Sequence, residues 1–277
     1  MILLPEDDYI SAIRALKEVT FNNLFARSVV EKHVNGKVYV DDFANPKAFY
    51  VVHLYGMALL YGDISEKFLH FDFKNTVFEC YGLQKTGRWL QVFPQNLEDQ
   101  IDVIFKDRIS VFDSNKFKDD YSVNIIKHKR VNFRFNLEKY NSFRCGLDIT
   151  KYCFCDVNVD IFNETNGSVV PNRFWNNAND FITNGAGFSL IADDHPVSIA
   201  FSSFVHEGMF ELGMETKSEF RRRGYASIVC ARLIDYCLER GLEPIWACSL
   251  GNNASYELAL KLGFEPIAYL PYYELRN

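Results

Sequence analysis

Three consecutive arginines, Arg221 to Arg223, stand directly before Gly224 and an apolar run with helical spacing. The free N–H groups at the start of a helix attract anions, and a glycine lets the backbone come close to a ligand. Arginine side chains add charge-assisted hydrogen bonds of the kind that phosphate groups accept. The stretch therefore predicts a phosphate-binding loop, although the same charges could simply solvate a surface turn.

A second polar stretch, Asn252 to Ser255, opens another helical run that ends at Lys261-Leu262-Gly263-Phe264. Asparagine is a preferred cap at the start of a helix, and glycine commonly follows the end of one. The second half of the chain thus contains two loops that each lead from a strand into a helix.

The elements that must position these loops follow in the order strand, helix, three strands, helix, strand, helix, strand. Apolar alternation, helical spacing and turn residues define them. Their predicted ranges are 152–160, 174–185, 187–192, 196–205, 209–216, 226–238, 244–250, 252–263 and 265–275, the last as one or two short strands.

The first half of the chain is mixed α and β and contains no motif that indicates chemistry. Helices are expected over 7–20 and over 96–105, the second opened by Asn96 as its cap. Residues 48–62 predict two buried strands or a strand and a turn, and 107–128 predict loops. Three further strands are predicted, at 36–42, 88–93 and 130–136.

The two loops, in this order and at this separation, resemble those of the GNAT superfamily of acyl-CoA N-acyltransferases. Its signature is Arg or Gln, two residues, Gly, one residue, and Gly or Ala, which Arg221, Gly224 and Ala226 match. Its next helix commonly starts with Asn and ends in a KLGF-like tetrapeptide, as Asn252 to Phe264 do. The stretches FWNNANDFITNGAGFSLI, FELGMETKSEFRRRGYAS and IWACSLGNNASYELALKLGF also look like the zwittermicin A resistance subgroup, whose members carry an extra N-terminal portion of about this size.

This resemblance implies an α/β (α+β) fold with a mixed, mainly antiparallel central sheet flanked by helices. It covers residues 150–277, which we expect to form the acetyl-CoA-binding domain after an N-terminal α/β domain of unknown role at 1–149. The N-terminal domain could be a degenerate copy of the same fold, because it too shows strands, then RWLQVFP, then a helix.

The resemblance also implies acetyl-CoA as acetyl donor. The pyrophosphate would lie on the backbone N–H groups from Arg222 to Ala226, in front of the helix dipole. The pantetheine arm would pair along Gly213 to Glu215 like an added strand, and Asn252 would hydrogen-bond it from the other side. The expected cofactor-binding set is Gly213, Met214, Glu215, Thr216, Arg221, Arg222, Arg223, Gly224, Tyr225, Ala226, Asn252 and Ser255.

A base must remove a proton from the amine before it attacks the thioester, because a lysine-like amine has a pKa of about 10. Glu211 is the expected base, although it could be an outward-facing surface carboxylate. Glu215 shares its strand face and is the second candidate. Many family members carry a tyrosine acid at the position of Ala259, so that role is unassigned here; Tyr256, one turn earlier, is a candidate, and packing is its alternative use.

The bulk composition narrows the function further. The formal net charge of −6 disfavours broad nucleic-acid binding, and the 48% hydrophobic content is normal for a soluble globular protein. The first residues, MILLPEDDY, do not resemble a signal peptide, and the longest apolar stretch, 48–62, is too short to span a bilayer, so we expect a cytoplasmic protein without a membrane partner. Seven scattered cysteines form no CxxC pair, so we expect no metal. The sequence thus predicts an acetyl-CoA-dependent N-acetyltransferase that acts on a primary amine of a small molecule. The alternative is a catalytically inactive CoA-binding sensor or scaffold module, and the sequence does not indicate an oligomeric state.

Overall fold

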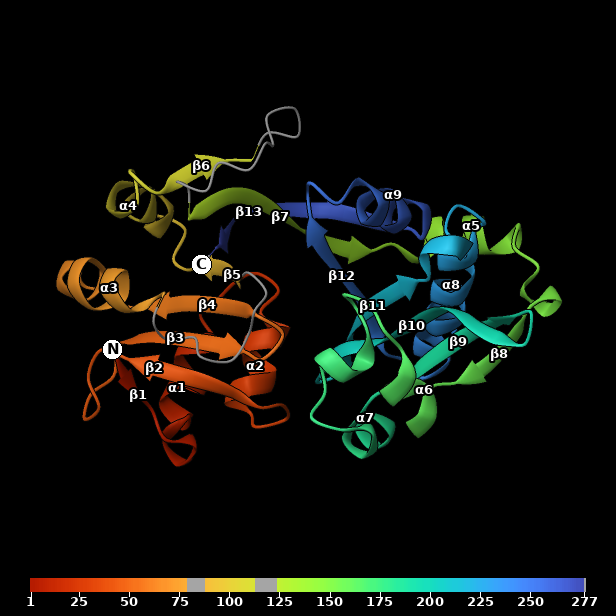
Figure 1. Cartoon of the computed structure of the whole chain (residues 1–277), viewed down its shortest axis with the longest axis horizontal. Coiled ribbons are helices and arrows are strands. Elements are labelled where there is room, and N and C mark those ends of the chain that lie inside the picture. The colour runs from red at the N-terminus through yellow and green to blue at the C-terminus, as the bar shows by residue number, and fades with distance from the viewer. Residues whose placement is uncertain (79–87, 113–123, 277) are drawn as a thin grey trace. The chain divides into compact units, whose positions relative to one another are not determined.

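The computed structural model of the chain describes residues 1–78, 88–112 and 124–276 (Figure 1). They form two compact units of mixed α/β architecture. The first unit contains Met1–Val131, Ser249–Gly251 and Tyr269–Asn277; the second contains Asn132–Cys248 and Asn252–Ala268. These divisions differ from the predicted boundary at residues 149 and 150, because strands β7 (Ile125–Phe135) and β13 (Phe264–Leu275) each run through both units.

The first unit is built on the strand order β1-β2-β3-β4-β5-β13-β7, with β6 paired to β7. Strands β1 to β4 pair antiparallel in sequence order, and β4 then pairs parallel with β5. Its elements are β1 (Ile2–Leu3), η1 (Glu6–Asp8), α1 (Ile10–Leu16), α2 (Leu24–Val30), β2 (Gly36–Val40), β3 (Ala48–His53), β4 (Met57–Gly62), η2 (Phe68–Phe73), α3 (Lys74–Thr76), β5 (Arg88–Val92), α4 (Leu97–Ile104) and β6 (Ile109–Val111).

The second unit contains the meander that the sequence predicts. Strands β8 to β11 pair antiparallel in sequence order, and β11 pairs parallel with β12. Its elements are α5 (Leu137–Cys145), η3 (Ile149–Lys151), β8 (Cys153–Asp156), α6 (Val159–Glu164), η4 (Pro171–Arg173), α7 (Ala178–Asn184), β9 (Gly187–Ala192), β10 (His195–His206), β11 (Met209–Thr216), η5 (Ser218–Phe220), α8 (Tyr225–Glu239), β12 (Glu243–Ser249) and α9 (Asn253–Lys261).

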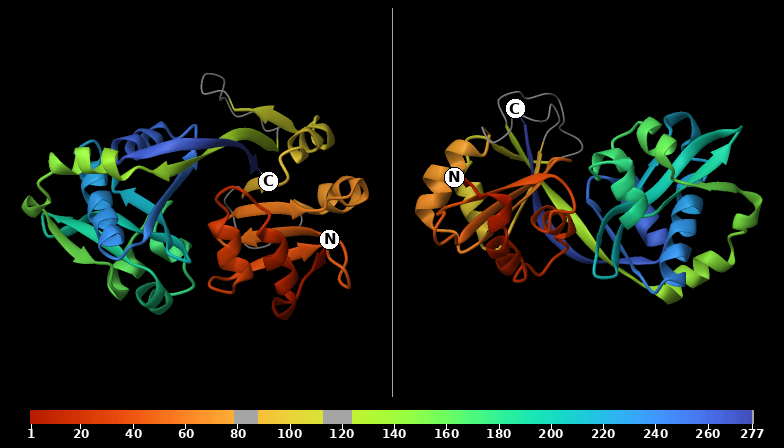
Figure 2. Two further views of the ribbon diagram at one scale, coloured as in Figure 1. Left: turned by 180° about the vertical axis from the view of Figure 1, so that it is seen from behind. Right: turned by 90° about the horizontal axis from the view of Figure 1, so that it is seen from below.

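The two faces of this second sheet are covered by different segments, because neighbouring residues of a strand point to opposite faces. Helix α8 covers one face, where its Tyr236 contacts the rings of Phe188 and Phe210. On the other face, the Phe174 ring contacts those of Phe201 and Phe204. Figure 2 shows α8 against strands β9 to β11 from two further directions.

Helix α8 forms where the predicted apolar stripe occurs. Its buried side chains include Val229, Leu233 and Ile234, which recur at helical spacing. The helix ends at Glu239, and Gly241 follows its C-cap with a left-handed φ of +66°; Leu242 N–H donates to the Cys237 carbonyl at 2.9 Å. This is a Schellman termination, which satisfies carbonyl groups that the last turn leaves free.

The first unit repeats the plan of the second. In each, a first strand is followed by two helices, three antiparallel strands, a helical segment, a strand parallel to the third, and another helix. The predicted second copy of the fold in the N-terminal half is therefore present in element order and pairing. The loop after β4 reads Asp63-Ile64-Ser65, however, and has neither the arginines nor the glycine found after β11.

Several predicted elements differ in detail from those observed. Strand β8 ends at Asp156 rather than at residue 160, because Asn158 caps α6 by accepting a hydrogen bond from Ile161 N–H. Asn96 precedes α4 but makes no side-chain cap bond. The region 107–128, expected as loops, contains β6 and the start of β7; its residues 113–123 lie outside the described part of the chain.

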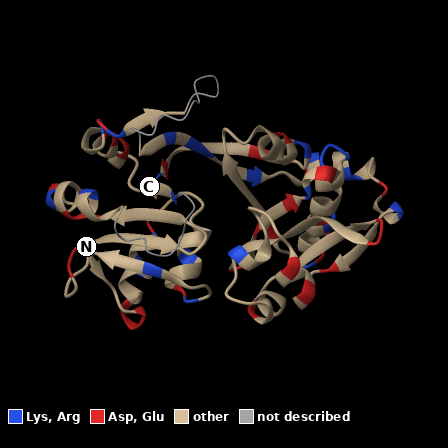
Figure 3. Ribbon diagram, viewed as in Figure 1, with Lys and Arg blue, Asp and Glu red and all other residues tan. Residues whose placement is uncertain are grey.

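Charges of both signs are interspersed along the chain (Figure 3). No helix in the described parts of the chain combines the length and the hydropathy that a bilayer span requires. Because positive and negative side chains are interspersed along the chain, the three consecutive arginines before α8 are a local concentration of positive charge.

Candidate functional site

A cavity of about 560 Å³ lies in the second unit at the start of α8. It brings together the two polar loops that the sequence singles out, together with the end of β11. Its lining residues are Ser168, Val169, Met214, Glu215, Thr216, Phe220, Arg221, Arg222, Gly224, Tyr225, Ala226, Ser227, Asn252, Ala254, Ser255, Leu258 and Lys261.

The cavity opens where two parallel strands stop pairing. The register of β11 with β12 runs from Met209↔Glu243 to Glu211↔Ile245. Strand β11 continues to Thr216, paired with β10 on its other side. The stretch after Glu211 thus offers main-chain groups on the β12 side, and an extended ligand can pair with such an edge.

The start of α8 provides the donors of an anion site. Gly224 is the N-cap, with a φ of +84° that glycine adopts without strain. Ser227 and Ile228 direct their N–H groups to its carbonyl, at 3.1 and 3.3 Å. In the first turn of a helix, the N–H groups of Tyr225 and Ala226 have no intrahelical partner. Together with the helix dipole they favour a bound anion.

The three arginines play different parts in the structure. The Arg221 guanidinium makes two hydrogen bonds: its Nε donates to the Thr216 carbonyl at 3.0 Å and its Nη2 donates to Glu215 at 3.2 Å. Arg223 lies 5.1 Å from the Phe220 ring centroid and does not line the cavity. Arg222 does line it, and within the described residues it has no ion pair or side-chain hydrogen bond. Its charge is therefore available to a ligand.

The start of α9 forms the opposite wall. Asn252 caps α9 as predicted, its Oδ1 accepting a hydrogen bond from Ser255 N–H at 3.2 Å. Its side-chain NH₂ therefore remains as the group that can donate to a ligand. Ser255 Oγ accepts from Trp246 Nε1 at 3.3 Å and keeps its own proton to donate.

Glu211 lies at the last residue pair before β11 and β12 separate. It is 5% exposed, so it is not the outward-facing surface carboxylate that the sequence left open. Its side chain is absent from the cavity wall described above. The structure thus brings Glu211 to the inner end of the strand separation, and its role as base stays a prediction.

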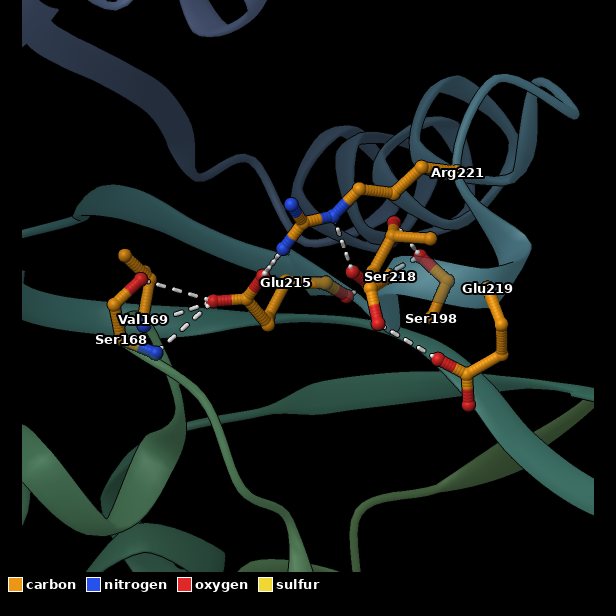
Figure 4. A network of polar contacts seen from close by, with 8 residues as sticks. Ser168, Val169, Ser198, Glu215, Ser218, Glu219 and Arg221 are labelled. Atoms are coloured by element: carbon orange, nitrogen blue, oxygen red, sulfur yellow. Dashed lines mark hydrogen bonds and ion pairs between the residues drawn. The ribbon is translucent and has the colours of Figure 1, made fainter.

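Glu215, the second candidate base, is tied into a network of hydrogen bonds (Figure 4). Its Oε2 accepts from Ser168 N–H and Oγ, both at 3.1 Å, and from Val169 N–H at 3.3 Å. Its Oε1 accepts from Arg221 at 3.2 Å. Both oxygens are already occupied by donors, so the arrangement favours a holding role over proton transfer.

Neither Tyr256 nor Ala259 is among the residues that line the cavity. The Tyr256 ring packs 5.5 Å from that of Phe133, and Ala259 is fully buried. A thiolate leaving group with a pKa of about 8.5 can depart without a dedicated acid. The alanine at the position of the usual tyrosine acid therefore does not argue against catalysis.

Sequence reasoning missed several residues of the wall. Ser168 and Val169 come from a connector without a motif, and no local pattern predicts their contact with Glu215, which follows them by 47 and 46 residues. Leu258 and Lys261 follow Ala254 by four and seven residues, a helical spacing that could have placed all three on one face of α9. Among the described residues, no group of three His, Cys, Asp or Glu side chains could hold a metal ion.

Comparison with known proteins gives a consistent result. A family model described as GNAT acetyltransferase matches residues 15–273. A Bacillus subtilis protein named uncharacterized N-acetyltransferase YdfB is 27% identical over 268 residues, which cover 95% of each chain.

Solved structures with a similar fold extend over nearly the whole chain. A GCN5-related N-acetyltransferase-like protein from Streptococcus suis covers 98% of this chain and 100% of its own, with a TM-score of 0.72 at 19% identity. A tandem GNAT protein from the clavulanic acid biosynthesis pathway covers 99% and 97%, with a TM-score of 0.58 at 10% identity. At these identities the likeness concerns the fold, and it includes the N-terminal half.

Proposed function

The chain belongs to the GNAT acetyltransferase family, and from that premise we propose that it transfers the acetyl group of acetyl-CoA to a primary amine of a small molecule. The family implies an N-acetyltransferase with acetyl-CoA as co-substrate. The proposal adds the residues that bind the co-substrate and the class of the acceptor.

The observation that carries the proposal is the cavity itself, whose wall matches the chemistry of CoA part by part. The start of α8 with Arg222 suits the pyrophosphate, because it offers N–H donors and positive charge. The β11 edge suits the extended, amide-containing pantetheine arm proposed along Gly213 to Glu215, of which Met214 and Glu215 line the cavity. Asn252 then supplies a side-chain donor from the opposite wall. The first unit has no arginine-glycine loop at the equivalent position, which favours one CoA site per chain.

For the chemical step we propose Glu211 as the group that accepts the amine proton. It lies on β11 at the point where the cavity strands separate, and it is buried. Acetyl-CoA supplies the thioester, while the chain orients its arm along β11 and excludes water. A buried carboxylate at this point is suited to proton transfer once the amine is bound.

The acceptor assignment rests on the likeness of three stretches to the zwittermicin A resistance subgroup. That likeness supports a small amine-bearing molecule rather than a protein side chain. The formal net charge of −6 likewise disfavours broad nucleic-acid binding.

The test is turnover of acetyl-CoA against a panel of small primary amines, with product identified by mass spectrometry. We expect CoA release that depends on both enzyme and amine, with one acetyl group on the product nitrogen. If the protein binds CoA tightly but acetylates no amine of the panel, the hypothesis of a catalytically inactive CoA-binding sensor or scaffold replaces that of an enzyme.

A further inference from the structure

The carboxylate of Glu215 joins two walls of the cavity that belong to distant parts of the chain (Figure 4). One oxygen holds the connector at Ser168 and Val169, and the other holds Arg221. Arg221 in turn donates to the Thr216 carbonyl. All five of these residues line the cavity. The Glu215 carboxylate therefore sets the spacing between the two walls.

A carboxylate is the group that these neighbours require. Two main-chain N–H groups and a hydroxyl donate on one side, and a guanidinium donates on the other. A glutamine at this position has one acceptor oxygen and one NH₂ donor group. Its oxygen can accept from one set of donors only, and its NH₂ group would then point at the donors on the other side. The Glu215 side chain is 15% exposed, which limits replacement of these bonds by water.

Gly167 shows how closely the connector fits this carboxylate. A Cβ at Gly167 would lie 2.8 Å from Glu215 Cγ and 2.9 Å from its Oε2. Its φ is not in the left-handed region, so alanine is compatible with the backbone there. Gly167→Ala therefore displaces the Glu215 side chain without removing its charge.

We propose that Glu215 is a positioning residue that clamps the connector Gly167–Val169 and Arg221 into the wall of the CoA cavity. It acts neither as the base nor as a ligand of CoA through its carboxylate. The clamp deepens the proposed function, on which it rests for the identity of the ligand. Its disruption should weaken CoA binding while the reaction of bound acetyl-CoA continues.

Removing the Glu215 carboxylate changes CoA affinity in opposite directions under the two explanations, the clamp and a simple electrostatic effect of a nearby negative charge. CoA is an anion, so removal of a carboxylate beside its site strengthens binding if electrostatics alone act. The clamp predicts the opposite for Glu215→Gln. We expect the Kd for CoA and the KM for acetyl-CoA to rise about tenfold or more, since hydrogen bonds to a charged group contribute at least about one factor of ten.

Glu219→Gln is the matched control, because it removes one carboxylate from the neighbouring loop. Glu219 accepts from the Ser218 hydroxyl at 2.9 Å and does not line the cavity. We expect CoA binding in this variant to stay unchanged or to tighten slightly. Gly167→Ala should behave like Glu215→Gln although the net charge is unchanged, and it remains informative if Glu215→Gln does not fold.

Calorimetry with CoA, steady-state kinetics and thermal unfolding together distinguish a positioning role of Glu215 from a role as the base. The clamp predicts a raised KM for acetyl-CoA with kcat, its pH profile and the KM for the amine retained. Unchanged or tighter CoA binding in both Glu215→Gln and Gly167→Ala would overturn the clamp. A fall in kcat with loss of its acid limb would instead make Glu215 the base. Because calorimetry needs no acceptor, failure of wild-type turnover would count against the proposed function and not against the clamp.

Discussion

Gly224→Glu is the substitution that probes the anion site most severely. Gly224 is the N-cap of α8 with a φ of +84°, and a Cβ built there meets no atom within 4 Å. A glutamate side chain thus has room to extend, and it extends from a residue of the cavity wall. It would place a negative charge where the pyrophosphate is proposed to lie.

The expected magnitude follows from what the substitution removes. Hydrogen bonds to charged groups contribute about 1.5–3 kcal/mol each, so loss of two from the α8 N–H groups amounts to about 3–6 kcal/mol. Since 1.4 kcal/mol is about a factor of ten, the Kd for CoA should rise about 10²–10⁴-fold. The left-handed conformation adds a cost of about 1–2 kcal/mol to folding, which lowers the Tm by a few degrees.

A second glycine provides a control for strain and charge together. Gly241 has a φ of +66° at the other end of α8, and a Cβ there also meets nothing within 4 Å. Gly241→Glu should lower the Tm similarly and leave CoA affinity unchanged. Gly224→Ala should carry the strain without the charge, and therefore lose stability but little affinity.

Calorimetric titration with CoA, preceded by circular dichroism to check folding, is the assay. Folded Gly224→Glu protein that binds CoA within about threefold of the wild type would refute the assignment of the pyrophosphate to this loop. Equal weakening in Gly224→Glu and Gly241→Glu would show that the loss comes from strain in α8 rather than from a blocked anion site.

Four further outcomes are expected. Glu211→Gln should lower kcat about 10²–10⁴-fold with CoA affinity retained and partial recovery at high pH, where free amine exists; full activity would remove Glu211 as base. Arg222→Ala should weaken CoA binding about three- to tenfold, most at low ionic strength, whereas Arg240→Ala at the far end of α8 should not. Saturating CoA should raise the Tm of the wild type through linkage, and no shift at millimolar CoA would contradict a CoA site. The pKa of Glu265 is lowered from 4.5 to about 2, mainly by hydrogen bonds from Lys139 and Arg134; the stability it contributes is present above about pH 4.5 and lost as pH falls toward 2, so acid unfolding should be less steep in Glu265→Gln.

The parts of the fold that the sequence predicted well are those with strong local signals. Strands β9 and β11 begin and end where alternation and turn residues place them, and α8 follows its apolar stripe and ends at Glu239. The cap at Asn252 also forms as predicted. In each case the energetic preference resides in neighbouring residues, so the local pattern suffices.

The parts that escaped prediction depend on contacts between distant residues or on competing local signals. Alternation over 152–160 suggested one strand, but Asn158 captures the Ile161 N–H and starts α6 instead. The connector at Ser168 reaches Glu215 across 47 residues, and nothing in either stretch indicates the pairing. The separation of β11 from β12 after Glu211 is likewise a property of the sheet, which no local residue pattern indicates.

A structure of the protein with CoA bound tests the central claim most directly, because it locates each part of the ligand. We predict that the pyrophosphate contacts the N–H groups between Arg222 and Ala226, with the pantetheine arm along Gly213 to Glu215. Asn252 should donate to the arm from the opposite wall. A pyrophosphate bound to residues before position 150, or outside this cavity, would contradict the account.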